Sequence, residues 1–309
     1  MVLLLTKTNI MRALVKFLGV LILICFAFAC ENEEVILEEA SNDLENIEEI
    51  NGKAGPWSRQ FTDNFNTNGN LNKWERTHNR ADYNSSRCTY RNWNAEIASL
   101  DGRSCLRLQA YESGNDSYES GHVKSNFDFH PERNEEYRLT ARIKLIAKQG
   151  NNYKGFAETY GAWPAFWTVN ERSNTWPTRG EIDIMEGYSF GNSARFASNL
   201  FYGENYLQNQ LGTNAERGYN LGEGWHTYQQ RWINRNGWVT VQIYVDGNRV
   251  ASYNNNVDND LELENFKDHN IIFNLNVGSD TGIFNNSRID IFWNTYMYVD
   301  YVRLDKRSI

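Results

Sequence analysis

Three acidic residues lie close together in the segment Glu181-Ile-Asp-Ile-Met-Glu186. On a β-strand, side chains at positions i and i+2 share one face, so Glu181 and Asp183 point the same way and the two isoleucines point into the core. Strict alternation would turn Glu186 to the opposite face. A β-bulge that accommodates Met185 returns Glu186 to the face of the other two acids. The segment therefore predicts three carboxyl groups on one face of a bulged strand.

This arrangement of carboxyl groups suits the hydrolysis of glycosidic bonds. Crowded acids repel one another and raise at least one pKa, a cost in stability that is typical of functional sites. In a retaining glycosidase one carboxylate attacks the anomeric carbon, and a second carboxyl group about 5–5.5 Å away protonates the leaving oxygen and later activates water. The central Asp183 can hydrogen-bond the attacking carboxylate and tune both pKa values. The alternative is an exposed strand face with scattered acids, which the many flanking aromatic residues argue against.

The body of the chain has the pattern of a β-sandwich. From Trp57 onward, short runs alternate between apolar and polar residues, as half-buried strands do. Asp-Gly and Asn-Gly pairs, which favour tight hairpin turns, lie between such runs. No long stretch has helical periodicity, so we expect one all-β sandwich or barrel. The clearest runs are Cys105–Ala110, Tyr137–Leu145 and Val239–Val245, and the turn pairs are Asp101-Gly102, Asn236-Gly237 and Asp246-Gly247.

Four further segments accompany the acidic one, in a fixed order along the chain. They are Gly161-Ala-Trp-Pro-Ala-Phe-Trp167, Trp225-His-Thr-Tyr228, Tyr244-Val-Asp-Gly247 and Tyr298-Val-Asp-Tyr-Val-Arg303. With these segments the chain resembles glycoside hydrolase family 16, the laminarinase, β-agarase and κ-carrageenase family, over about residues 57–305. The resemblance implies a β-jelly-roll sandwich of two antiparallel sheets with a concave substrate cleft. It also implies a retaining double-displacement reaction with Glu181 as nucleophile, Glu186 as acid/base and Asp183 as the assisting acid.

Aromatic residues near the acidic segment are candidates for stacking on sugar rings. Trp163, Trp167 and Trp176 flank that segment, but a tryptophan can equally belong to the core, and alternation cannot place all three in the cleft. Trp176 is the strongest candidate because it precedes Pro177 in a predicted loop. The weaker candidates for substrate binding are Asn199, Phe201 and Tyr202 on the next strand, and Arg87, Arg91 and Trp93 in an early loop.

No catalytic cofactor is expected. The five histidines and the two cysteines of the body lack metal-ligand spacing. His226 lies in a segment that is a strand remote from the acids in the family, so we interpret it as structural. Many family members hold a structural Ca²⁺ through a carboxylate of the closing strand, and Asp300 matches that position. Cys88 and Cys105 either form a disulfide, which export would favour, or remain two buried thiols.

The N-terminus has the pattern of an export signal. Lys7, Arg12 and Lys16 precede an apolar run, residues 17–29, that is too short for a membrane span. The run ends in Phe-Ala-Phe-Ala-Cys30, which resembles a bacterial lipobox with a lipidated cysteine. An ordinary signal peptide with an incidental cysteine is the alternative, and either Met1 or Met11 could be the start.

These patterns predict three parts of the chain. Residues 1–30 form the lipoprotein signal peptide, residues 31–54 an acidic linker, and residues 55–309 the catalytic domain. From Glu31 to Ile50 there are nine acidic residues and no Lys or Arg, which is typical of a segment without a packed core. The resulting protein would be an outer-membrane or cell-surface lipoprotein of Bacteroidetes type, or one released outside the cell. We expect a monomer that contacts the membrane through its lipid. The net charge of −8 argues against a nucleic-acid partner.

The polysaccharide is the least determined part of the prediction. Laminarinases usually carry a Thr-x-His element on the strand after the acidic segment and a Gly-Gly-x-Trp-Pro-Gly loop near the C-terminus. Here those regions are Ala197–Gly203 and Val277–Ile283. We therefore favour an endo-acting hydrolase of an algal β-galactan such as agar, with an endo-β-1,3-glucanase as the alternative. A non-catalytic carbohydrate-binding jelly roll is the alternative of another class.

Overall fold

The computed structural model describes residues 54–66, 70–81, 86–114, 117–155, 159–171, 176–187, 196–204, 209–213, 224–279, 284–291 and 294–309. The chain divides into two units, Met1–Ala54 and Gly55–Ile309, and the second contains all but one of the described residues. The predicted signal peptide, the lipidation site Cys30 and almost all of the acidic linker lie outside the described residues. Among the described helices, none has the length and apolar character needed to cross a membrane.

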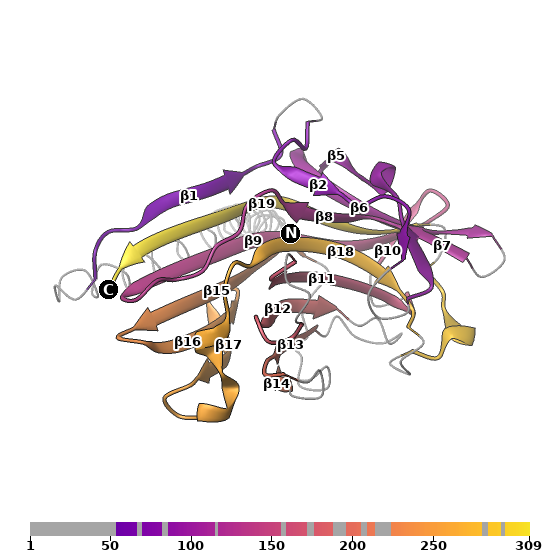
Figure 1. Ribbon diagram of the computed structural model, residues 1–309. Helices are drawn as coiled ribbons and strands as arrows, with labels where there is room; N and C mark the ends of the chain where they lie inside the picture. Colours follow the sequence, from indigo (N-terminus) through magenta and orange to yellow (C-terminus); the bar gives the residue numbers. More distant parts are fainter. Residues whose placement is uncertain are drawn as a thin grey trace, which may run out of the picture. The chain divides into compact units, whose positions relative to one another are not determined.

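A twelve-stranded sheet forms one layer of the second unit (Figure 1). Among the described residues, its strand pairs are antiparallel except β4 with β7. Its central strands, β9 and β19, pair along nearly their whole length. The order of its hydrogen-bonded strands is β17 (Asn248–Asn254), β16 (Trp238–Val245), β15 (His226–Arg235), β9 (Glu135–Gln149), β19 (Asn294–Ser308), β6 (Arg103–Gly114), β7 (Ser117–Ser120), β4 (Cys88–Tyr90) and β3 (Arg80–Ala81). Three further strands pair with members of this series: β1 (Ser58–Asp63) with β19, β10 (Asn152–Gly155) with β9, and β5 (Ala95–Leu100) with β6.

A seven-stranded antiparallel sheet forms the other layer. Its strands follow one another in Figure 1 from β14 through β12 and β18 towards β2. The order is β14 (Asn209–Thr213), β13 (Phe196–Phe201), β12 (Glu181–Gly187), β11 (Ala162–Val169), β18 (Asn270–Val277), β8 (His122–Ser125) and β2 (Trp74–Arg76). The helices among the described residues are single 3₁₀ turns at Asn92–Asn94, Asn259–Leu261, Leu263–Asn265 and Asn286–Arg288. The predicted all-β sandwich of two antiparallel sheets is confirmed.

The hydrophobic core joins the inner faces of the two sheets. Leu139 and Val299 from the twelve-stranded sheet share one buried cluster with Ile182 and Phe273 from the seven-stranded sheet. Phe166 stacks on Phe273 with ring centroids 4.7 Å apart. This packing follows from alternation, because every second residue of each strand points inward.

The predicted hairpin turns are confirmed by their backbone angles. Asn236 and Gly237 have φ of 56° and 96° and connect β15 to β16, and Asp246 and Gly247 have φ of 48° and 78° and connect β16 to β17. Two consecutive positive φ values match the twist of an antiparallel hairpin, which is why Asn-Gly and Asp-Gly occupy these positions.

The predicted disulfide is wrong, because Cys88 and Cys105 are buried thiols that form no disulfide. Cys88 belongs to the main core cluster. Cys105 belongs to a separate cluster with Tyr296 and Tyr298. Burial raises the pKa of the Cys105 thiol to about 12, so this thiol stays protonated.

Candidate active site

The predicted bulge in the acidic strand is confirmed. On β12, Asp183 lies opposite Trp167 of β11 and Asn199 of β13, whereas Glu186 lies opposite Ala165 and Ala197. The register shifts between Asp183 and Glu186, so one extra residue is accommodated; against β11 it is Ile184 and not the predicted Met185, which lies opposite Phe166. Ile182, Ile184 and Met185 are fully buried in the core. The bulge therefore leaves the three acids on one side of the sheet, which we call the carboxylate face.

Glu181 is the most accessible of the three acids, because Asp183 and Glu186 are buried and Glu181 is half-buried. The indole Nε1 of Trp176 donates a hydrogen bond of 2.8 Å to Oε2 of Glu181. Trp176 itself is 46% exposed and packs beside Phe201 with ring centroids 5.6 Å apart. The strand begins after Gly180, which has a φ of +81° and whose Cβ would lie 2.3 Å from the Phe266 ring. Only glycine fits there, so the entry into the strand is fixed.

Glu186 is held from both of its oxygens. Nε1 of Trp163 donates to Oε1 at 2.9 Å, and Nδ2 of Asn199 donates to Oε2. Asn199, predicted to bind substrate, thus orients a carboxyl group. Oδ1 of Asn199 is buried and has no hydrogen-bond partner among the described residues. Two donors on one carboxylate stabilise its charged form.

Asp183 has the opposite electrostatic environment. It is 3% exposed, and burial, followed by the charges of Glu186 and Glu181, raises its pKa well above the ordinary value. A hydrogen bond to Glu186 acts in the same direction, and one from Asn199 opposes it. Asp183 therefore keeps a proton near Glu186, while Glu181 keeps its donor from Trp176. The three acids therefore differ in burial and in hydrogen-bond partners.

Asp183→Asn is expected to stabilise the fold more at pH 8 than at pH 4. The pKa of Asp183 is raised on folding, so its stability contribution is complete below the unfolded pKa of about 3.9 and is lost as pH rises through the folded pKa. Asparagine carries no charge at either pH. Each kcal/mol recovered would raise Tm by about 2–4 °C in a domain of this size. Thermal unfolding of both proteins at the two pH values measures the difference.

Asp101→Asn is the matched control for this pH dependence. The Lys144 ammonium and the Trp225 indole lower the pKa of Asp101, so its replacement should cost stability at pH 8 and less at pH 4. An equal Tm difference at both pH values for Asp183→Asn would contradict the raised pKa.

Trp163 and Trp167 both lie on the carboxylate face. They are four residues apart on β11, and Nε1 of Trp167 donates to Oδ1 of Asn274 at 2.6 Å. Only 4% of Trp163 and 9% of Trp167 is exposed. Their indoles thus lie beneath the site and hold its polar groups. The indole of Trp176 is the one that is open for stacking, in agreement with its place in a loop.

The early-loop candidates contact β7, the end of β18 and one another. Nε of Arg91 donates to Oε1 of Glu119 on β7 at 2.8 Å, and its guanidinium lies over the Trp93 ring. Trp93 is 53% exposed and contacts His78. The backbone N–H of Arg87 donates to the carbonyl of Val277. Their substrate-binding role stays a prediction. The interpretation of Tyr202 as a groove residue is wrong, because its side chain belongs to the core.

The surroundings of Asp300 do not fit a calcium ion. Oδ2 of Asp300 accepts from Arg103 at 3.3 Å and from Arg142 at 3.4 Å, so two guanidinium groups occupy the positions where a cation would bind. Within the described ranges, no group of three His, Cys, Asp or Glu side chains could hold a metal. Nδ1 of His226 lies 2.7 Å from Oδ2 of Asp246, in the turn that follows β16, which agrees with a structural role.

Sequence reasoning missed several polar residues of this face. Asn274 and Asn276 alternate with apolar residues in β18, and Tyr90 hydrogen-bonds to both. The polar–apolar alternation in Asn270-Ile-Ile-Phe-Asn-Leu-Asn276 was the signal that could have revealed them.

Comparisons with known proteins agree with this geometry. Residues 152–217, which include β12, match the family model of the XgeA-like catalytic domain of glycoside hydrolase family 16. No curated protein matches the chain. Similar solved structures include a family 16 enzyme from the mixed-linkage glucan locus of Bacteroides ovatus with a G4G4G3G product. It is 24% identical, with 79% of this chain and 99% of that chain covered and a TM-score of 0.60.

Two further structures share the fold. An endo-1,3-β-glucanase from Streptomyces sioyaensis is 20% identical, with 83% of this chain and 99% of that chain covered and a TM-score of 0.64. A laminarinase catalytic domain from Thermotoga petrophila is 22% identical, with 81% and 98% covered and a TM-score of 0.60. The chain is thus similar to the XgeA-like catalytic domain of glycoside hydrolase family 16 across the acidic strand, and it shares its two-sheet fold with these solved structures.

Proposed function

We propose that the chain is an endo-acting, retaining hydrolase of β-glucan. The observation that carries the proposal is the set of three carboxyl groups on one face, each with different hydrogen-bond partners. Glu181, with one donor and partial exposure, would attack the anomeric carbon. Glu186 would protonate the leaving oxygen and later remove a proton from water. The raised pKa of Asp183 supports its role as the residue that supplies Glu186 with that proton.

The geometry supports this division of roles through charge. The leaving oxygen needs an acid at the moment of bond cleavage, and a proton held between Asp183 and Glu186 is available there. A carboxylate attacks only when it is ionised, and the Trp176 indole favours the ionised form of Glu181. Trp176 and Phe201 would contact the sugar next to the scissile bond with their accessible ring surfaces.

The comparisons favour β-glucan over agar as the substrate. The Bacteroides structure described above is named for mixed-linkage glucan, and the Streptomyces structure is named for 1,3-linked glucan. Agar remains the second candidate because of one observation. Residues 197–203, on and after the strand that follows the acidic one, lack the laminarinase Thr-x-His element, and Asn199 of that strand donates to Glu186. The substrate side of the site therefore differs from that element.

Reducing-sugar release from a panel of polysaccharides tests the substrate. The full chain is incubated with laminarin, mixed-linkage glucan, agarose, porphyran and carrageenan, and binding to each polymer is measured in parallel. We expect release from laminarin or mixed-linkage glucan. Release from agarose alone would overturn the glucan assignment and keep the mechanism. Binding without release from any polymer would instead identify a carbohydrate-binding protein.

A further inference from the structure

Strand β18 lies two strands from the carboxylates, on the same sheet. The register aligns Asp183 on β12 with Trp167 on β11, Ile272 on β18 and Lys124 on β8. A polysaccharide that crosses the strands from Asp183 in this direction would pass Trp167 and then reach Ile272. Yet every residue of β18 is buried, including Ile272 and Asn274, which face the carboxylate side. Trp167 packs against Ile272 and donates to Asn274, and further groups must cover the rest of β18 on that side.

Tyr90 covers the part of β18 that contains Asn274 and Asn276. Its hydroxyl donates to Oδ1 of Asn276 and accepts from Nδ2 of Asn274 at 3.2 Å. Its ring lies 5.0 Å from the ring of His122, the β8 residue opposite Asn274. Tyr90 is 1% exposed, so β4 is packed firmly onto β18 and β8.

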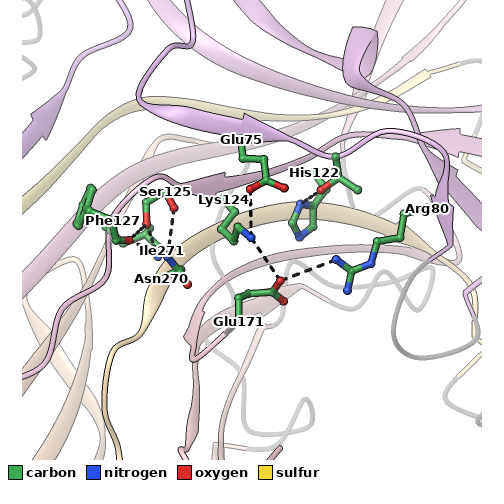
Figure 2. A network of polar contacts seen from close by, with 10 residues as sticks. Glu75, Arg80, His122, Lys124, Ser125, Phe127, Glu171, Asn270 and Ile271 are labelled. Atoms are coloured by element: carbon green, nitrogen blue, oxygen red, sulfur yellow. Dashed lines mark hydrogen bonds and ion pairs between the residues drawn. The ribbon is translucent and has the colours of Figure 1, made fainter. Parts of the chain in front are cut away.

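A chain of ion pairs covers the part of β18 near Ile272, which lies opposite Lys124 (Figure 2). Glu171 follows β11, and Lys124 belongs to β8, on the far side of β18. Nζ of Lys124 lies 3.6 Å from Oε2 of Glu171, so the pair passes over the face of β18. Figure 2 shows Lys124 between Glu75 and Glu171, with Arg80 approaching Glu171 from the other side. Only 11% of the Glu171 side chain and 21% of that of Lys124 is exposed.

We propose that Tyr90, Arg80, Lys124 and Glu171 form an end wall that closes the substrate site at β18. Two strand spacings of about 4.8 Å separate β12 from β18, which is room for about two sugar rings between the scissile bond and the wall. A longer chain must end there or bend away from the sheet. The inference rests on the proposed function and adds the number of subsites on one side of the cut.

The cleavage pattern of oligosaccharides tests the wall. The full chain is given reducing-end-labelled oligosaccharides of increasing length, prepared from the polymer that it hydrolyses, and mass spectrometry locates each cut. For the wild type we expect kcat/KM to rise until two sugars occupy the walled side and then to stay level. In the Lys124→Ala/Glu171→Ala variant, a third sugar on the walled side should raise kcat/KM by about threefold or more. Equal gains from third and fourth sugars on both sides in the wild type would overturn the wall.

Two further variants separate a steric wall from other effects. Lys124→Met/Glu171→Gln keeps the side-chain volumes and removes the charges, so its cleavage pattern should match that of the wild type. A pattern like that of the double alanine variant would mean charge recognition and would refute a steric wall. Lys144→Ala breaks an ion pair with Asp101 on the other sheet and should leave the pattern unchanged. If no oligosaccharide is cut at all, the proposed function fails first, which is distinct from a cut with an open-ended pattern.

Discussion

Glu181→Gln is expected to reduce polysaccharide hydrolysis by on the order of 10⁴-fold or more, as the loss of a nucleophile does in other enzymes. Glutamine keeps the shape of the side chain and accepts the hydrogen bond from Trp176, so the fold should persist. It cannot form the glycosyl–enzyme bond, because an amide oxygen is a poor nucleophile. Reducing-sugar release under saturating polymer, together with thermal unfolding, separates lost chemistry from lost structure.

Chemical rescue distinguishes a nucleophile from a merely structural acid. Glu181→Ala leaves space beside the anomeric carbon, and added azide can then attack a 2,4-dinitrophenyl glycoside from the open face. The expected product is the glycosyl azide with inverted configuration. Retained configuration, or activity of the glutamine variant close to that of the wild type, would rule out Glu181 as the nucleophile.

Glu186→Gln is expected to lower kcat on the polymer by about 10²–10⁴-fold, the usual contribution of a general acid. Its effect should depend on the leaving group. A dinitrophenolate departs without protonation, so release of dinitrophenol in the first turnover should be nearly unchanged. Stopped-flow measurement of this burst, followed by the slower steady state, reports the two steps separately.

The pH profile provides the contrast for Glu186. The wild type needs a proton on the Asp183/Glu186 pair, so its kcat/KM on the polymer should fall at high pH. In Glu186→Gln this alkaline limb should disappear. Loss of the limb in Asp183→Asn alone, with Glu186→Gln unchanged, would transfer the acid role to Asp183.

The acids and their strand could be predicted from the sequence because they depend on neighbours along the chain. Alternation in Glu181–Glu186 determines which side chains share a face. Glu186 is one residue out of step with that alternation, so it joins the other acids only through the bulge that the structure contains. The Asn236-Gly237 and Asp246-Gly247 turns are local for the same reason, since positive φ favours these residues.

The partners of the acids were decided only by the tertiary structure. Asn199 reaches Glu186, and Trp163 reaches it from the opposite side, because of the register between three strands. Register and sheet order are properties of the whole fold, and a pattern in one strand does not reveal its neighbours. Asn199 could therefore be singled out as a site residue, whereas its contact with a carboxylate could not be predicted.

The same limit explains the errors and the omissions. Export favoured a disulfide between Cys88 and Cys105, but the two residues belong to separate buried clusters. Lys124 and Glu171 meet across β18 although they are 47 positions apart in the sequence. By itself the sequence determined which acids share one face of a bulged strand and the sandwich class, because periodicity along the chain encodes both. The tertiary structure alone decided which groups hold each carboxyl and which close the end of the site, because packing brings distant segments together.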